Sequence, residues 1–491
     1  MSLLGLDVGT SGCKAAVYSL SGRRISLSYQ DYTLVHPSPG WSELAHDQVR
    51  QAVRRVLKEA NAKALDDPVE SLSISSQGEA VAPADSRGEP LNNFVVTFDN
   101  RAVEEAEFLE RRIGRKRLFE LTGMSPSSIY SICKILWFKH QRPDIYEKTW
   151  KFFCVGDFVA YELTGTVAID RSLAARTMAL GLPGGSWCTE VLDAAGVAKE
   201  LLPEVVPSGT PLGRVRRELS RELGFTRPVL VAAGGHDQAC GALGAGVLGE
   251  GSAMNSLGTV EVICPGFNSP KLDPRMLESN YCCYDHVVPS RYLSISFNLS
   301  AGLLLKWYRD LFFAEMSYEE LIDNASDRVS SVLFLPHFVG SGTPYMDARS
   351  KGAVVGLTIE TTKEELTRSL LDSLILEARL ALERFSEAGT AITELKAIGG
   401  GAKSERWLQM KANALGIPIR AMEESEAGTL GAAILGGVGA AVFDTAAEAA
   451  EAMVRIGKEY SPDVSETAAY DEVFSRYKEL YPALRDLHHH L

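Results

Sequence analysis

The sequence predicts an α/β fold made of two similar halves. Strand-like and helix-like segments alternate along most of the 491 residues, which is typical of the α/β class. Each half opens with two apolar runs around a turn that contains Gly and Thr, over residues 3–18 and 252–263. A chain of this length can form more than one domain with a substantial core. We therefore expect a duplicated fold with two domains, residues 1–246 and 247–491, and a cleft between them.

The first segment has the spacing of a β-hairpin, and its turn carries groups suited to a polyphosphate. Glycines let the backbone approach a ligand, hydroxyls donate hydrogen bonds, and a lysine adds positive charge. The candidate phosphate-binding residues are Gly9, Thr10, Ser11 and Lys14. Asp7, at the end of the first strand, can hold Mg²⁺ directly or through water. The alternative is a surface hairpin with an incidental aspartate.

Further along the chain, apolar patterning predicts the remaining elements. In the first half we expect strands at residues 24–29, 69–74, 94–98 and 230–233, a helix at 47–64, and mostly helices between 99 and 165. In the second half we expect a strand at 395–398 and helices at 300–313, 363–388 and 404–415. The uncharged stretch 427–443 is short for a membrane span, so it predicts a buried helix. Residues 244–251 are rich in glycine and are the expected hinge.

Composition narrows the class of partner. The net charge of −13 argues against nucleic acid, and no segment has the length and hydropathy of a membrane anchor. The N-terminus lacks the features of a signal peptide, and the eight cysteines are scattered without metal-binding spacing. We expect a reducing, cytoplasmic setting and a small-molecule partner, with neither nucleic acid nor membrane, and we leave a homodimer open.

Asp237 is the candidate catalytic base. It follows a predicted strand and the pair Gly234-Gly235, so it lies where a strand ends and a helix begins. In an open α/β sheet this edge is where ligands bind, and a carboxylate there can accept the proton of a hydroxyl. The alternative is a helix N-cap, a position that aspartate also favours. Gln238 beside it can form a hydrogen bond with a polyol.

Four sequence motifs, spread over both halves, carry a resemblance to a known family. They are GLDVGTSGCK, GGHDQACGALG, SLGTVEV and IGGGAKSERWLQMKANALG. On these motifs the chain resembles the FGGY family of carbohydrate kinases over nearly its whole length, and is most like the xylulose kinase group. The resemblance implies two ribonuclease-H-like domains, as in actin-like ATPases, around a central cleft. It also implies that ATP and Mg²⁺ are used to phosphorylate a sugar hydroxyl by in-line transfer, with Asp237 as general base.

The resemblance assigns the nucleotide mainly to the C-terminal domain. The residues that match the second phosphate motif, the nucleotide-lining helix and the adenosine motif are Gly258, Thr259, Gly302, Lys306, Gly400, Gly401 and Ala402. Glycines after a strand let an adenine or a ribose lie on bare backbone. The alternatives are a loop that needs glycine for packing and, at Lys306, a solvated helix face.

The resemblance assigns the sugar mainly to the N-terminal domain, near Gln77, Gly78, Glu79 and Asp99. At this position the resemblance implies Met-His in xylulose kinases and Arg-Glu in glycerol kinases, whereas this chain has Gly78-Glu79. The glutamate is present and the arginine is missing, and we expect Gly78 to leave room for a larger substrate. The glycerol kinase tyrosine falls on Ile129, one place before Tyr130.

A ketopentose such as xylulose is therefore the expected substrate. Glycerol or another polyol is the alternative within the same family, because Glu79 matches the glycerol kinase carboxylate. More remote alternatives are a non-kinase actin-like ATPase, such as a chaperone or a filament protein, and a sugar sensor without catalysis.

Overall fold

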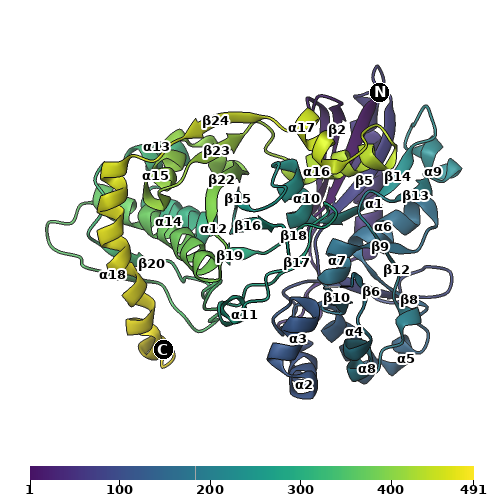
Figure 1. Cartoon of the computed structure of the whole chain (residues 1–491), viewed down its shortest axis with the longest axis horizontal. Coiled ribbons are helices and arrows are strands. Elements are labelled where there is room, and N and C mark those ends of the chain that lie inside the picture. The colour runs from purple at the N-terminus through teal and green to yellow at the C-terminus, as the bar shows by residue number, and fades with distance from the viewer. Residues whose placement is uncertain (183) are drawn as a thin grey trace.

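The structure of the protein, a computed structural model, describes residues 1–182 and 184–491 and has two lobes, each built on a β-sheet (Figure 1). The first sheet has the order β13-β14-β5-β1-β2-β3, with β1, β5 and β14 parallel and the others antiparallel to their neighbours. Its strands are β1 (Ser2–Val8), β2 (Gly12–Ser19), β3 (Arg24–Asp31), β5 (Val69–Ser76), β13 (Pro211–Arg214) and β14 (Leu230–His236).

The second sheet repeats this arrangement. It again starts with an antiparallel hairpin, whose first strand pairs in parallel with a later strand, and the order is β17-β18-β16-β15-β22-β23-β24, with β19 on β16. The strands are β15 (Gly251–Leu257), β16 (Glu261–Phe267), β17 (Tyr284–Asp285), β18 (Tyr292–Leu293), β19 (Ser296–Asn298), β22 (Ile392–Ile398), β23 (Ile419–Met422) and β24 (Ile456–Tyr460). The predicted α/β fold with two related halves is confirmed.

Short strands make smaller sheets. One sheet of the first lobe contains β4 (Glu43–Leu44), β6 (Val81–Ala84), β7 (Phe94–Val95) and β8 (Lys151–Cys154). Separate pairs are β9 (Ala168–Asp170) with β12 (Glu204–Val206), β10 (Leu180–Gly181) with β11 (Ser186–Trp187), and β20 (Leu333–Leu335) with β21 (Ala353–Val355). The predicted strand over 94–98 is wrong in length. It ends at Val95 because the chain then turns, and the Asp99 N–H donates to the Val96 carbonyl at 3.2 Å.

Helices cover the sheets. In the first lobe they are α1 (His46–Ala62), α2 (Val103–Ile113), α3 (Arg115–Thr122), α4 (Ser131–Gln141), α5 (Pro143–Tyr146), α6 (Val155–Thr164), α7 (Arg171–Ala175), α8 (Thr189–Ala195), η1 (Lys199–Leu201), α9 (Arg217–Glu222) and α10 (Asp237–Gly244). In the second lobe they are α11 (Pro274–Glu278), α12 (Ala301–Phe312), α13 (Tyr318–Asp323), α14 (Lys363–Glu387), η2 (Gly400–Lys403), α15 (Glu405–Leu415) and α18 (Val464–His488). The predicted apolar face of α1 is buried at Val49, Val53 and Leu57.

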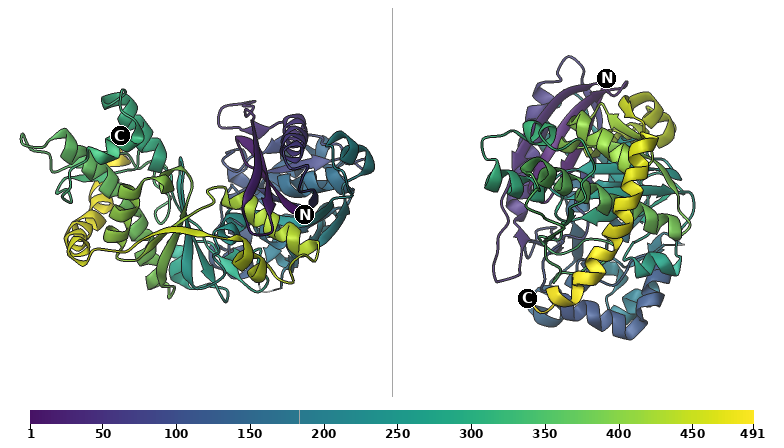
Figure 2. Two further views of the ribbon diagram at one scale, coloured as in Figure 1. Left: turned by 90° about the horizontal axis from the view of Figure 1, so that it is seen from above. Right: turned by 90° about the vertical axis from the view of Figure 1, so that its left-hand side faces the viewer.

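Two helices from the second half of the chain, α16 (Ala427–Gly439) and α17 (Ala446–Met453), pack with the first lobe. Figures 1 and 2 show this yellow-green segment beside the purple strands. The buried helix expected in the uncharged stretch is therefore confirmed as α16. The chain passes between the lobes at residues 245–250, where we expected the hinge, and again before α16 and after α17. The domain division after residue 246 stays a prediction.

Glycines allow α16 to cross α10 with direct backbone contact. A Cβ atom at Gly431 would lie 1.9 Å from the Cys240 carbonyl oxygen, and one at Gly244 would lie 1.9 Å from the Ala427 carbonyl oxygen. Neither position can accept a side chain without moving a helix. Among the described residues, no helix combines the length and the apolar character needed to cross a bilayer. The eight cysteines each carry a free thiol.

Candidate active site

One edge of the first sheet gathers most of the predicted site. The parallel strands β1, β5 and β14 end together, because Val8 pairs with Ser76 and Ser76 pairs with His236. The residues just beyond these ends are the β1–β2 turn, the segment 77–79 and Asp237. The carboxyl edge of a parallel sheet is the usual ligand site of an open α/β fold. The structure thus brings the predicted phosphate turn, sugar residues and base to one place.

Gln77 holds the β1–β2 turn in position. Its amide Nε2 donates to the Gly9 carbonyl at 3.0 Å, and its Oε1 accepts from the Thr10 hydroxyl at 3.2 Å. The Gly9 N–H is used within the turn, where it donates to the Gly12 carbonyl at 3.0 Å, whereas Ser11 is exposed. Both polar groups of Gln77 are therefore engaged with the turn, and its expected role as a sugar ligand has no support in these contacts.

Asp7 and Lys14 face each other across β1 and β2. Asp7 Oδ1 accepts a hydrogen bond from the Ser75 hydroxyl at 2.6 Å. Burial raises the pKa of Asp7 above its ordinary value, against the opposing effects of Ser75 and of the Lys14 charge. The Lys14 ammonium lies 2.6 Å from Oε2 of Glu426, directly before α16. The sequence did not reveal this partner, which is far from Lys14 in the chain.

The residues at this edge fit a Mg²⁺ ion that arrives with phosphates. Among residues 1–182 and 184–491, no group of three or more His, Cys, Asp or Glu side chains is placed to hold a metal. Mg²⁺ usually takes one or two carboxylates together with substrate phosphates and waters, so a single aspartate beside a phosphate turn is a suitable donor set. Asp7 remains the residue predicted to hold it.

Asp237 is the first residue of α10, and the cap position belongs to His236. The N-cap alternative therefore does not describe it. Its side chain is 31% exposed, and burial, followed by the negative charges of Asp7 and Glu79, raises its pKa to about 7. A carboxylate with a pKa near neutral is well suited to accept a proton from a hydroxyl. The start of a helix also favours a negative charge.

Glu79 forms an ion pair with Arg176, which follows α7. Glu79 Oε1 accepts from the Arg176 Nε at 2.6 Å, and Oε2 accepts from the Thr97 hydroxyl at 3.0 Å. The two charged side chains are only 5% and 8% exposed. Burial acts to raise the pKa of Glu79, but the positive charges around it, Arg176 first, hold it below its ordinary value. Glu79 is therefore an ionised carboxylate with both oxygens engaged.

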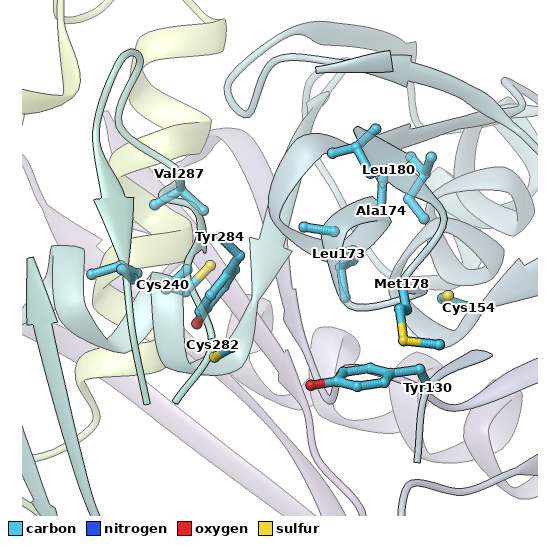
Figure 3. Packing of buried hydrophobic residues seen from close by; sticks show 14 of the residues in the cluster. Tyr130, Cys154, Leu173, Ala174, Met178, Leu180, Cys240, Cys282, Tyr284 and Val287 are labelled. Carbon is cyan, nitrogen blue, oxygen red and sulfur yellow. The ribbon is translucent and has the colours of Figure 1, made fainter. Parts of the chain in front are cut away.

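Two tyrosine rings enclose the Arg176 guanidinium. Its central carbon lies 5.3 Å from the ring centroids of both Tyr130 and Tyr284. Figure 3 shows the two tyrosines in one packed cluster, Tyr284 from the second half of the chain and Tyr130 just before α4. The glycerol kinase tyrosine aligns with Ile129, but the aromatic ring that lies next to this ion pair is that of the neighbouring residue, Tyr130. Ile129 contributes its carbonyl, which accepts from Lys134 Nζ at 2.8 Å.

The space beside Gly78 is filled by an imidazole. A Cβ atom at Gly78 would lie 3.0 Å from two ring atoms of His236. His236 thus occupies the direction in which a side chain at residue 78 would project, and the expectation that Gly78 leaves room for a larger substrate stays a prediction. His236 Nδ1 lies 3.1 Å from the Tyr284 hydroxyl, and its Nε2 lies 3.2 Å from Asp237 Oδ1. Sequence reasoning missed His236, although it stands inside the GGHDQ motif, where an imidazole beside the candidate base was the available signal.

The two remaining candidate sugar ligands, Asp99 and Gln238, differ in whether their polar atoms already have partners. Asp99 is 1% exposed, and its oxygens accept from the Ser42 N–H and from the Arg101 backbone and guanidinium. These contacts explain Asp99 as a structural partner of Arg101, and a role in the sugar pocket stays a prediction. Gln238 Oε1 is buried and accepts no hydrogen bond from residues 1–182 or 184–491, so it is an unused acceptor, and its role as a sugar ligand stays a prediction.

A cavity of about 500 Å³ lies in the second lobe, at the corresponding edge of its sheet. The predicted residues in its lining are Gly258, Thr259, Gly302, Lys306, Gly400 and Gly401. A Cβ atom at Gly400 would meet nothing within 4 Å, whereas one at Gly302 would lie 2.4 Å from the Gly258 carbonyl oxygen. Lys306 is paired with Asp310. Ala402 is not part of the lining, although it lies in η2 with Gly400 and Gly401, because it packs toward the core.

Comparison with known proteins decides the family. Models of the N-terminal and C-terminal domains of the FGGY family of carbohydrate kinases match residues 2–244 and 253–440. The chain belongs to the FGGY family of carbohydrate kinases. It is 27% identical to the xylulose kinase of Staphylococcus xylosus over 482 residues, covering 98% of this chain and 99% of that protein.

Solved structures agree on the fold of this kinase. A ligand-bound xylulose kinase from Lactobacillus acidophilus is 25% identical, with a TM-score of 0.92 and coverage of 99% of this chain and 98% of the other. A gluconate kinase from the same organism is 26% identical, with a TM-score of 0.92 and coverage of 98% of both chains. The family makes this chain a sugar kinase, which removes the alternatives of a non-kinase ATPase and a sensor. Overall similarity does not select the sugar.

The buried ion pair generates a first prediction. Arg176→Met leaves the Glu79 carboxylate buried and unpaired, and it should lower the free energy of unfolding by about 3–5 kcal/mol. Removing both charges, in Arg176→Met with Glu79→Gln, should cost less than the single change, because no buried charge is left alone. Urea unfolding followed by circular dichroism measures both.

The control is Arg117→Met, which removes an ion pair with Glu190 whose side chains are 49% and 47% exposed. An exposed pair of this kind contributes less than about 1 kcal/mol. If Arg176→Met is no more costly than Arg117→Met, the buried pair does not have the role described.

Proposed function

We propose that this kinase transfers the γ-phosphoryl group of ATP to a hydroxyl of a ketopentose such as xylulose, with Asp237 as general base. The observation that carries the proposal is the position of Asp237, half-buried at the sheet edge, beside the β1–β2 turn and outside the helix cap. Its raised pKa supports proton acceptance near neutral pH. The family supports the sugar kinase reaction itself.

In the proposed reaction, Asp237 accepts the proton of the sugar hydroxyl as that oxygen attacks the γ-phosphorus in line with the leaving group. The β1–β2 turn, with the Thr10 and Ser11 hydroxyls and the Lys14 charge, binds the transferring phosphate. Mg²⁺, when bound with ATP, neutralises negative charge on the phosphates, and Asp7 is the residue of this chain that would hold it. Closure of the lobes excludes water from the transfer.

The cavity of the second lobe supports binding of the adenosine part of ATP. Its volume of about 500 Å³ lies within the usual range for small-molecule sites. Gly400 and Gly401 present bare backbone, and the side chains of Tyr318 and Trp407 contribute aromatic surface to the lining. The Gly258–Thr259 turn at the same cavity matches the β1–β2 turn of the first lobe, so phosphates lie between the two turns in this proposal.

A polyol, such as glycerol, is the second candidate substrate. The arginine missing beside Glu79 in sequence is supplied in space by Arg176, whose Nε lies 2.6 Å from Glu79 Oε1. This restores the guanidinium and carboxylate that the glycerol kinase pattern places together. Against glycerol, the site also offers Asp237 and Gln238, and a longer sugar has more hydroxyls than glycerol with which to pair these groups.

The role of Asp237 is tested by Asp237→Asn. Loss of the base should lower kcat by about 10²–10⁴-fold, while ATP still binds, because proton acceptance contributes that much to comparable reactions. Phosphorylation assays and calorimetric titration with ATP measure the two effects. The control is Asp47→Asn, an exposed aspartate in the first turn of α1 that should leave the rate unchanged. A rate above about a tenth of wild type in Asp237→Asn would remove Asp237 from the role.

The nucleotide site is tested at Gly400. Gly400→Val should raise KM for ATP about 10-fold or more and leave KM for the sugar nearly unchanged, because the new side chain projects into the cavity. Ala402→Val is the matched control, since it lies two residues further along the same turn but outside the lining. Equal KM values for ATP in both variants would contradict the assignment.

The substrate is tested by comparing kcat/KM for xylulose and glycerol. Glycerol has fewer hydroxyls and would leave buried polar atoms such as Gln238 Oε1 unpaired, and each unpaired group costs about 1–3 kcal/mol. We expect kcat/KM to be at least about 10-fold higher for xylulose. A clear preference for glycerol would assign this kinase to the polyol branch.

A further inference from the structure

His236 connects the candidate base to the second half of the chain. It is the last residue of β14, directly before Asp237, and its side chain is 5% exposed. One ring nitrogen faces the Tyr284 hydroxyl at 3.1 Å, and the other faces Asp237 Oδ1 at 3.2 Å. Tyr284 opens β17 in the second sheet, so these contacts span both halves.

The chemistry of the three groups fixes the hydrogen positions. Burial and the nearby charge of Arg176 keep His236 neutral, since they lower its pKa to about 3. A neutral imidazole has one N–H donor and one acceptor nitrogen. In its ionised form the Asp237 carboxylate can only accept, so a hydrogen on Nε2, 3.2 Å from Oδ1, suits this contact. Nδ1 must then accept from the Tyr284 hydroxyl.

The residues around His236 and Tyr284 restrain both side chains. Tyr284 is fully buried, and its ring lies 5.3 Å from the Arg176 guanidinium carbon. The imidazole occupies the space beside Gly78, where any side chain would press on the ring from 3.0 Å. The hydrogen bond to the buried Tyr284 hydroxyl therefore holds the ring in its orientation beside Asp237. The Asp237 carboxylate thus has His236 on one side, and Gln238 also donates hydrogen bonds to it from its backbone and side chain.

We propose that His236 is a positioning residue for Asp237, and that the Tyr284 hydroxyl fixes the imidazole in the tautomer that donates to the base. The inference rests on the proposed role of Asp237 as general base. A comparable arrangement orients metal-binding histidines, where loss of the orienting partner costs about 10–100-fold. Because Tyr284 belongs to the second half, the orientation of the base depends on contact between the two halves.

Two substitutions at His236 test the donor. His236→Leu removes the N–H and should lower kcat about 30–100-fold, with KM for ATP within about 2-fold of wild type. His236→Gln can place its amide N–H near the position of Nε2 and should recover kcat to within about 5-fold of wild type. A purely structural role would not separate kcat from KM for ATP and would not be rescued by an amide. Equal losses in the two variants would overturn the proposal.

Tyr284→Phe tests the tautomer without changing the ring. It should lower kcat about 3–10-fold, because the imidazole loses the donor that holds its orientation. The matched control is Tyr281→Phe, a buried tyrosine three residues earlier that stacks on Phe385 and whose hydroxyl faces the Ala381 carbonyl. It should retain the wild-type kcat. Identical rates for Tyr284→Phe and wild type would overturn the role of the hydroxyl, also if His236→Leu fails to fold.

Asp237→Asn, measured in the same series, separates this inference from the proposed function. If Asp237→Asn keeps the wild-type rate, the base assignment fails and the positioning role fails with it. If Asp237→Asn is inactive while His236→Leu and Tyr284→Phe keep the wild-type kcat, the base assignment stands and only the positioning role is overturned. Thermal unfolding of each variant identifies losses that come from misfolding.

Discussion

Backbone contact between α10 and α16 is the constraint on which the candidate site depends. The helices touch through Gly244 and Gly431, where a Cβ atom would lie 1.9 Å from a carbonyl oxygen of the other helix. The crossing fixes α10, whose first residue is Asp237, and brings the start of α16 to the β1–β2 turn, where Glu426 meets Lys14. A helix from the second half of the chain thus forms part of the wall behind the first phosphate turn.

Charge balance at this edge separates structural carboxylates from the candidate base. The protein has a net charge of −13, yet it gathers Asp7, Glu79, Asp237 and Glu426 around one turn. Glu79 is neutralised by a guanidinium, and Glu426 by an ammonium. Asp237 has no positive partner of this kind, so burial, followed by the negative charges of Asp7 and Glu79, raises its pKa to about 7 against the hydrogen bonds of Gln238, whereas the positive charges around Glu79 hold its pKa below the ordinary value.

The fold was predicted well because the patterns that specify it involve residues close together in the sequence. Both hairpins, the buried helix α16 and the position of Asp237 at a strand end follow from apolar periodicity and from residues adjacent in sequence. The contacts of the site are not local. Arg176 is 97 residues from Glu79, and no pattern in either segment predicts that the two residues form a pair. The contacts of Gln77 with Gly9 and Thr10 were not predicted, because the polar groups of a tight turn need partners and the sequence does not show which side chain supplies them.

Substrate identity cannot be transferred from aligned positions in this kinase. At Gly78-Glu79 the chain lacks both the histidine of the xylulose kinase pattern and the arginine of the glycerol kinase pattern. In space it has both groups, since His236 fills the volume beside Gly78 and Arg176 pairs with Glu79. The arginine and the glutamate neutralise each other and are almost fully buried, whereas Asp237 is 31% exposed and Gln238 Oε1 has no partner among the described residues. We therefore expect selectivity to depend on which polar groups can reach a sugar, and the two candidates without an ion-pair partner, Asp237 and Gln238, both lie on α10.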